Sequence, residues 1–114
     1  MFKMRNEQKV AFRNQAVLDF EDQMTRHVER CFPERRGALG EGGVREVIRL
    51  GIQRAATFGI IAERDVCRFV DLLLVFGVGL DRDCPWAREI LEALDPPDPA
   101  VRMDLLYERA LEEA

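Results

Sequence analysis

The stretch AERDVCRFVDLLLVFG, residues 62–77, decides the fold. From Val66 onward apolar side chains occupy most sides of a helix, and Gly77 stops the run. A helix that is apolar nearly all round is buried among other helices. Glu63 and Asp65 fall in the expected first turn, where carboxylates are stabilised by the positive end of the helix dipole. The stretch therefore predicts a central apolar helix, the third of the chain.

Asp71 is a lone charge inside this apolar helix. Burial of an unpaired carboxylate is costly, because the charge loses its hydration. We therefore expect Asp71 to be a buried polar residue that forms an ion pair with an arginine of the first or second helix. A polar contact at an interface with a partner is the alternative.

The second helix is predicted over residues 44–58. Its apolar side chains recur at i, i+3, i+4 and i+7. Gly51 and Ala55 lie four apart on the apolar face, where another helix could approach closely. The stretch ERRGALGEGG, residues 34–43, precedes it and is predicted to be a connector made of a helix C-cap and a turn.

Residues 6–31 are predicted to form one long helix, with Asn6 as its N-cap and Pro33 just beyond its end. At a rise of ~1.5 Å per residue this helix would be about 39 Å long, more than a small domain needs. It would either lie along the whole body or project into a partner. Three side chains that share one stripe of this helix are candidates for contacting that partner, namely Phe20, Met24 and His27.

Two aspartates in FGVGLDRDCPWAREIL, residues 76–91, raise the question of a metal loop. Asp81 and Asp83 fit the first and third positions of a calcium loop of the EF-hand type. Pro85 and Trp86 then occupy the fifth and sixth positions, where a ligand and a glycine are required. We therefore predict no metal site in this stretch.

The order of residues explains this stretch better as a corner between helices. Gly77 supplies backbone freedom after a helix. Asp83 or Cys84 is expected to cap the next helix, which Pro85 begins. Trp86 would fold back as a large apolar plug. The candidate partner contacts in this corner are Asp81, Asp83 and Trp86.

The rest of the chain is predicted to add a short helix over residues 85–94 and a last helix that Asp98 caps, with Pro99 at its first position. No alternating run is long enough to predict a strand. We therefore expect an all-α fold, a compact bundle of about five helices in a single domain over residues 1–114.

Composition and charge exclude several classes of function. The chain has 114 residues, a net charge of −4 and a pI near 5.1, which argues against nucleic-acid binding, because that requires clustered Lys and Arg. His27 is the only histidine, so histidine-dependent catalytic and metal sites lack a part. The three cysteines have no CxxC spacing and are predicted to be reduced structural thiols. We assign no catalytic, cofactor-binding or metal-binding residue.

The same sequence argues against a membrane protein. The N-terminal residues MFKMRNEQKV are charged and lack the apolar segment of a signal peptide. The apolar run Phe69–Leu80 is interrupted by Asp71 and is too short to span a bilayer. We expect a cytoplasmic protein.

Residues 59–87, GIIAERDVCRFVDLLLVFGVGLDRDCPWA, resemble a pattern of small helical bacterial proteins found in type VI secretion loci. In that pattern Gly-Ile-Thr precedes Glu-x-Asp-Val, and Phe-Gly precedes Phe-Asp-x-Asp-Pro and Pro-Trp-Ala. The chain departs at Ile61, where the pattern has a Thr cap, and between Asp83 and Pro85, where its loop is shorter. The matching positions are Gly59, Ile60, Glu63, Asp65, Val66, Phe76, Gly77, Asp81, Asp83, Pro85, Trp86 and Ala87.

The resemblance implies a non-enzymatic accessory role, as an effector adaptor, a chaperone or an immunity protein. The implied partner is a co-encoded secreted effector or spike component. An alternative is a small helical enzyme or ligand-binding domain that uses the carboxylates of Asp65, Asp71, Asp81 and Asp83. The incomplete set of catalytic residues favours the protein-interaction function.

Overall fold

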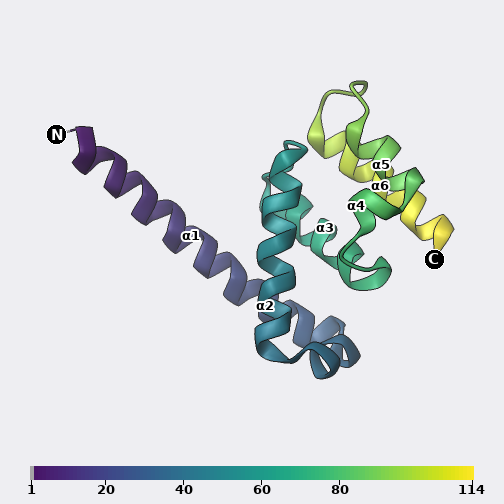
Figure 1. Cartoon of the computed structure of the whole chain (residues 1–114), viewed down its shortest axis with the longest axis horizontal. Helices are drawn as coiled ribbons and strands as arrows, with labels where there is room; N and C mark the ends of the chain where they lie inside the picture. The colour runs from purple at the N-terminus through teal and green to yellow at the C-terminus, as the bar shows by residue number, and fades with distance from the viewer. Residues whose placement is uncertain (1) are drawn as a thin grey trace. The chain divides into compact units, whose positions relative to one another are not determined.

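A computed structural model describes the backbone of residues 2–114 and the side chains of residues 15–114. Within that range every regular element is a helix and no strand is present, which confirms the predicted all-α fold. The elements are α1 (Phe2–Cys31), α2 (Pro33–Thr57), α3 (Glu63–Phe76), α4 (Leu80–Asp83), α5 (Pro85–Glu92) and α6 (Pro99–Glu113) (Figure 1). The described range holds one helix more than the expected five, because the corner forms the short helix α4.

The chain divides into two compact units, Met1–Arg45 and Glu46–Ala114, which we call the N-terminal and C-terminal units. The boundary lies inside α2, so each unit is described by itself. The expectation of a single domain over residues 1–114 stays a prediction.

The N-terminal unit contains α1 and the first part of α2. Helix α1 begins at Phe2, so the prediction of Asn6 as N-cap is wrong: its backbone is helical. The predicted end is confirmed, because α1 stops at Cys31 and Pro33 opens the next helix, a position where its missing N–H costs nothing. The predicted connector at 34–43 is also wrong. These residues are helical on both sides of a kink at Gly40, whose φ of 72° and ψ of 170° suit glycine alone.

Among residues 15–45, whose side chains the structure describes, ion pairs join α1 to the first part of α2. Arg45 Nη2 lies 2.9 Å from Asp22 Oδ1, and Arg36 Nε lies 3.5 Å from Glu29 Oε1. The hydrogen bond to Asp22 raises the pKa of the Arg45 guanidinium, so this group stays charged. The buried hydrophobic residues described in this unit are Phe20, Met24, Val28 and Val44.

Helix α3 is the most buried helix of the C-terminal unit, as its apolar sequence predicts. Phe69 and Val70 are 0% exposed. A Cβ added to Gly51 of α2 would lie 2.6 Å from Val70 Cγ2, so the absence of a side chain there lets the two helices approach closely. The helix also packs against α4 and α6. The predicted role of Gly51 is confirmed.

Both ends of α3 agree with the sequence. Gly77 follows the helix with a φ of 103°, a conformation that favours glycine, and its N–H donates to Leu73 O at 2.9 Å. The N-cap is Ala62, whose side chain makes no capping hydrogen bond. Ile61, where the type VI pattern has a Thr cap, lies one residue before this position.

The last two helices lie side by side in the C-terminal unit (Figure 1). Asp98 caps α6 as predicted, because its carboxylate accepts the N–H of Ala100 at 3.0 Å, and Pro99 is the first helical residue. Helix α5 ends at Glu92, and Leu94 beyond it is 92% exposed. In the part of the chain that the structure describes, every helix is too short or too polar to cross a lipid bilayer.

Candidate functional site

The corner after α3 is fixed by a buried ion pair. Arg54 Nη1 donates to Asp81 Oδ1 at 3.1 Å and also to the carbonyl oxygen of Val78. The Asp81 side chain is only 9% exposed, so its charge is neutralised inside the C-terminal unit. The expectation that Asp81 contacts a partner is therefore corrected: this carboxylate holds the corner to α2.

The predicted entry into α5 is confirmed in part. Cys84 is the N-cap residue, its carbonyl accepts the N–H of Arg88 at 3.0 Å, and Pro85 is the first helical residue. Neither Cys84 nor Asp83 makes a side-chain capping bond. The exposed Asp83 side chain instead folds over Gly79, and its Oδ2 occupies the place where a side chain at 79 would begin.

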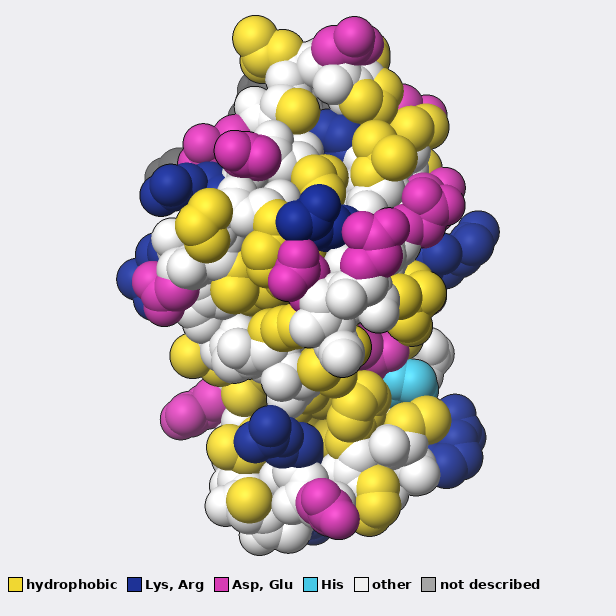
Figure 2. Space-filling view, turned by 90° about the vertical axis from the view of Figure 1, so that its right-hand side faces the viewer, with side chains coloured by type: hydrophobic (Ala, Val, Ile, Leu, Met, Phe, Trp, Pro, Cys, Tyr) yellow, Lys and Arg dark blue, Asp and Glu magenta, His cyan; other side chains and the backbone are white. Residues whose placement is uncertain are grey.

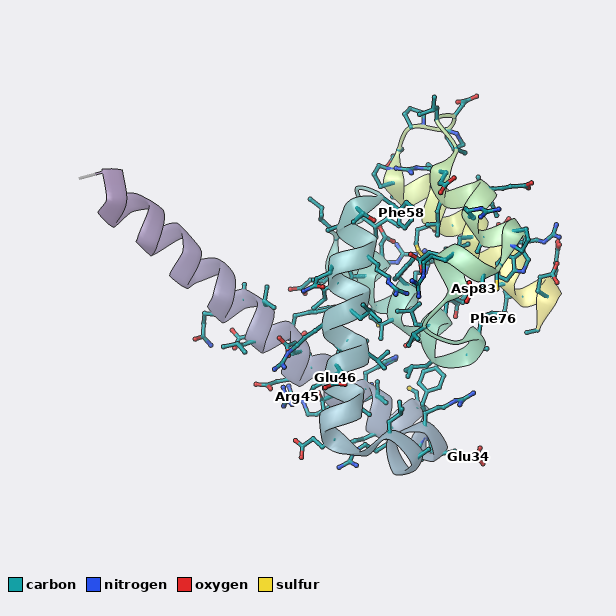
Figure 3. All side chains as sticks on the ribbon, viewed as in Figure 1. Glu34, Arg45, Glu46, Phe58, Phe76 and Asp83 are labelled. Carbon is teal, nitrogen blue, oxygen red and sulfur yellow. The ribbon has the colours of Figure 1, made fainter. Side chains whose placement is uncertain are left out.

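An aromatic pair marks the outer side of the corner. The rings of Phe76 and Trp86 meet edge to face, with centroids 5.3 Å apart and planes at 72°. Both side chains are half-buried, so Trp86 packs as predicted without becoming a fully buried plug. Val75 and Val78 are 48% and 45% exposed. We call Val75, Phe76, Val78, Asp83 and Trp86 the corner surface; Figure 3 labels Phe76 and Asp83.

The four carboxylates of the alternative hypothesis do not come together. Asp65 is 8% exposed and lies 3.7 Å from Arg68, whereas Asp81 is paired with Arg54. Among the described residues, no three of these four aspartates bring carboxylate oxygens into one cluster. The geometry therefore does not form the acidic site that this hypothesis requires.

The prediction for Asp71 needs correction. Its side chain is half-buried rather than buried, and the buried carboxylates of the C-terminal unit are Asp65 and Asp81. Asp71 shares a helical face with Arg68 and the exposed Val75, which explains its partial exposure. The identity of its partner stays a prediction.

The three candidates on α1 divide into two groups. Phe20 and Met24 are 8% and 2% exposed, so the expectation that they lie open to a partner is corrected by their burial. His27 is half-buried, and its ring lies edge to face with Phe32 at 6.2 Å between centroids. Its Nδ1 is 3.7 Å from the sulfur of Cys31 one turn later.

A second feature of the C-terminal unit is a hollow of about 480 Å³ beside Arg102. Arg102 Nη1 donates to Leu91 O and Nη2 to Phe58 O, both at 2.8 Å, so one guanidinium joins two helix C-termini. Its Nε is buried and has no hydrogen-bond partner. Figure 3 labels Phe58 at the end of α2. The lining residues are Thr57, Phe58, Leu91, Glu92, Ala93, Leu94, Pro97 and Arg102.

This hollow was not predicted from the sequence. The signal for it is weak: Arg102 lies four residues before the buried Leu106, on the inward side of α6. An arginine at such a position must find acceptors inside the fold. Its two acceptors are 11 and 44 residues away in the chain, so no local pattern identifies them.

Comparisons with models of protein families, with curated proteins and with solved structures found no match to this chain. Several of the residues quoted from the stretch 59–87 have a structural role of their own. Gly59 and Gly77 adopt positive φ values of 78° and 103°, and Pro85 begins a helix. Phe76, together with Asp83 and Trp86, lies on the corner surface. Residues 59–87 of this chain thus combine residues that the fold requires with residues that reach solvent.

Proposed function

We propose that this chain acts by binding another protein through the corner surface. The observation that carries the proposal is the half-buried Phe76–Trp86 pair, flanked by the exposed Val75 and Val78. Single exposed valines are ordinary on protein surfaces. A partly exposed tryptophan beside a second aromatic ring is a stronger indication of an interface, because such side chains supply much of the binding energy between proteins.

The rigidity of the corner supports this proposal. Arg54 binds both a side chain and a backbone carbonyl of the corner, and Pro85 fixes the start of α5. A surface that is already ordered loses little conformational entropy on binding. On the face shown in Figure 2, acidic and basic side chains are interspersed with hydrophobic ones.

The proposed partner follows from the resemblance of residues 59–87. We take it to be a co-encoded secreted effector or spike component of a type VI secretion system. The chain would bind it in the bacterial cytoplasm as an adaptor, a chaperone or an immunity protein, without turning over a substrate. The alternative enzyme or ligand-binding function through four aspartates has less support, because Asp65 and Asp81 are each held by an arginine.

Co-purification with the products of adjacent genes tests the proposal. The informative variant is Val78→Asp, and Val101→Asp on α6 is its matched control, because the two valines are 45% and 41% exposed in the same unit. We expect Val78→Asp to abolish co-purification and Val101→Asp to preserve it. Equal binding by both variants would show that the corner surface does not take part in the interaction.

Co-expression separates the possible roles. An immunity protein rescues cells from the toxicity of the neighbouring effector, and this rescue is lost with Val78→Asp. An adaptor or chaperone binds the effector and is needed for its export without rescuing the cells. Absence of binding to every neighbour, together with turnover of a small molecule by the purified protein, would overturn the proposal.

A further inference from the structure

Arg102 differs from the other half-buried arginines of the chain. Among the described side chains there are four others, and each has a carboxylate partner. The nearest N···O distances are 3.5 Å for Arg36, 2.9 Å for Arg45, 3.1 Å for Arg54 and 2.6 Å for Arg68. Over residues 15–114, whose side chains the structure describes, Arg102 has no carboxylate within 4.0 Å. Its positive charge is therefore not neutralised by an ion pair of the kind that the other four arginines make.

The hydrogen bonds of Arg102 leave part of its donor capacity unused. A guanidinium has five N–H groups in a planar fork. Two of its nitrogens donate to the neutral carbonyls of Leu91 and Phe58, and the buried Nε has no acceptor. The carbonyl dipoles at two helix C-termini stabilise a cation in part. They do not supply the bidentate acceptor that a guanidinium binds best, which is a carboxylate.

The remaining lining of the hollow combines apolar and polar surface. Phe58, Leu91, Leu94 and Pro97 contribute hydrophobic surface next to the guanidinium. Thr57 offers no free donor, because its hydroxyl donates to Arg54 O at 2.6 Å. A cation beside these hydrophobic side chains fits a ligand that carries one carboxylate on an apolar group.

We propose that the hollow beside Arg102 binds an apolar monocarboxylate. Two kinds of ligand carry an apolar group with one carboxylate, namely a small organic acid with an apolar tail and the C-terminal residue of a peptide. The site uses none of the corner surface, so the inference does not depend on the proposed function. The exposed Glu92 also lines the hollow and opposes an anion by charge repulsion. Removal of this charge in the variant Glu92→Gln should therefore make a carboxylate ligand bind more tightly.

Titration of the whole chain with octanoate tests the site, with uncharged octanamide as the matched ligand. We expect octanoate alone to bind, and the ¹⁵N–¹H signal of the Arg102 Nε to shift as it does so. A tripeptide ending in leucine, with a free or an amidated C-terminus, distinguishes the two sources. Tighter binding of the free peptide than of octanoate identifies a peptide C-terminus, and the reverse identifies a small acid.

Three variants tie the binding to the hollow. Arg102→Gln should weaken octanoate about tenfold or more, because a charged hydrogen-bond partner is lost. Since this variant also removes contacts to two helix ends, Leu94→Glu provides a second test at a side chain that is 92% exposed. We expect it to weaken binding about two- to fivefold, and Glu92→Gln to strengthen it by about twofold.

Several results would overturn the proposal. These are equal binding of octanoate and octanamide, no binding of octanoate or of the free peptide, or octanoate binding that is unchanged in both Leu94→Glu and Glu92→Gln. The variant Val78→Asp should lose binding of the partner protein at the corner surface. If the two sites are separate, the same variant should bind octanoate as the unchanged chain does. The two proposals therefore fail independently.

Discussion

The described ion pairs of the N-terminal and C-terminal units differ in the burial of their carboxylate partners. In the N-terminal unit, the carboxylates of Asp22 and Glu29 that pair with arginines are 52% and 49% exposed. The C-terminal unit has exposed partners too, since the side chains of Asp104 and Glu113 are 57% and 37% exposed. It also has two buried ones, because the side chains of Asp65 and Asp81 are only 11% and 9% exposed. A pair in solvent contributes little to stability, whereas breaking a buried pair leaves an unneutralised charge inside the protein.

The difference extends to the distribution of charge. Residues 1–45 contain nine basic and seven acidic side chains, and residues 46–114 contain eight basic and fourteen acidic ones. The acidic excess of the chain therefore lies in the unit that carries the corner surface and the Arg102 hollow. That unit also places its carboxylates selectively, because two are buried against arginines while Asp83 remains in solvent.

The largest expected effect is the loss of the central side chain of α3. Phe69 is 0% exposed, so Phe69→Ala should destabilise the C-terminal unit by about 3–5 kcal/mol through lost burial and a cavity. Urea unfolding followed by the fluorescence of Trp86, the only tryptophan, reports on this unit directly. Circular dichroism at 222 nm reports on both units. A loss below about 1 kcal/mol would show that α3 is not central.

The ion pairs give the most direct comparison of the two units. Asp81→Ala leaves Arg54, whose side chain is 19% exposed, without its carboxylate, and should cost about 2–4 kcal/mol. Asp22→Ala removes an exposed carboxylate from the N-terminal unit and should leave unfolding unchanged within experimental error. Urea titrations of both variants measure the difference. Equal effects would show that burial does not separate these pairs.

A third test concerns the kink in α2. Gly40 has a φ of 72°, which an alanine adopts only with strain, so Gly40→Ala should cost about 1–3 kcal/mol. Gly42 is helical and its Cβ position is open, so Gly42→Ala should stabilise the chain by about 0.5–1 kcal/mol. The thermal midpoints of the two variants should move in opposite directions. A shift in the same direction would contradict the kink.

The success of sequence reasoning differed between local and long-range features. The C-terminal end of α3 and the start of α6 were predicted, because Gly77, Asp98 and Pro99 act within a few residues of themselves. The segment 34–43 was predicted wrongly, because each glycine lowers helix propensity by about 1 kcal/mol without forbidding a helix. The kink needs only Gly40 to leave the helical conformation.

The functional residues were harder to predict, because their roles depend on distant partners. Asp81 was identified as a special residue, yet its partner Arg54 is 27 residues away, and that contact makes it structural rather than partner-binding. The importance of Arg102 depends on carbonyl groups of two other helices. Trp86 was placed correctly in the corner, since Pro85 fixes the start of its helix, but its half-buried state depends on Phe76.

The smallest expected effect tests how firmly the corner surface holds Asp83. The backbone of Gly79, with φ −93° and ψ 11°, is accessible to alanine, so the backbone sets no barrier to Gly79→Ala. The new Cβ would meet the carboxylate of Asp83, which is exposed and free to rotate away. We therefore expect a change in unfolding free energy within about 0.5 kcal/mol. The double variant with Asp83→Ala should then show no coupling between the two sites.

A cost above about 1 kcal/mol that Asp83→Ala relieves would mean that this carboxylate is fixed over Gly79, as Asp81 is fixed by Arg54. The corner surface would then present a negative charge of defined position, and its partner would need a basic group to match it.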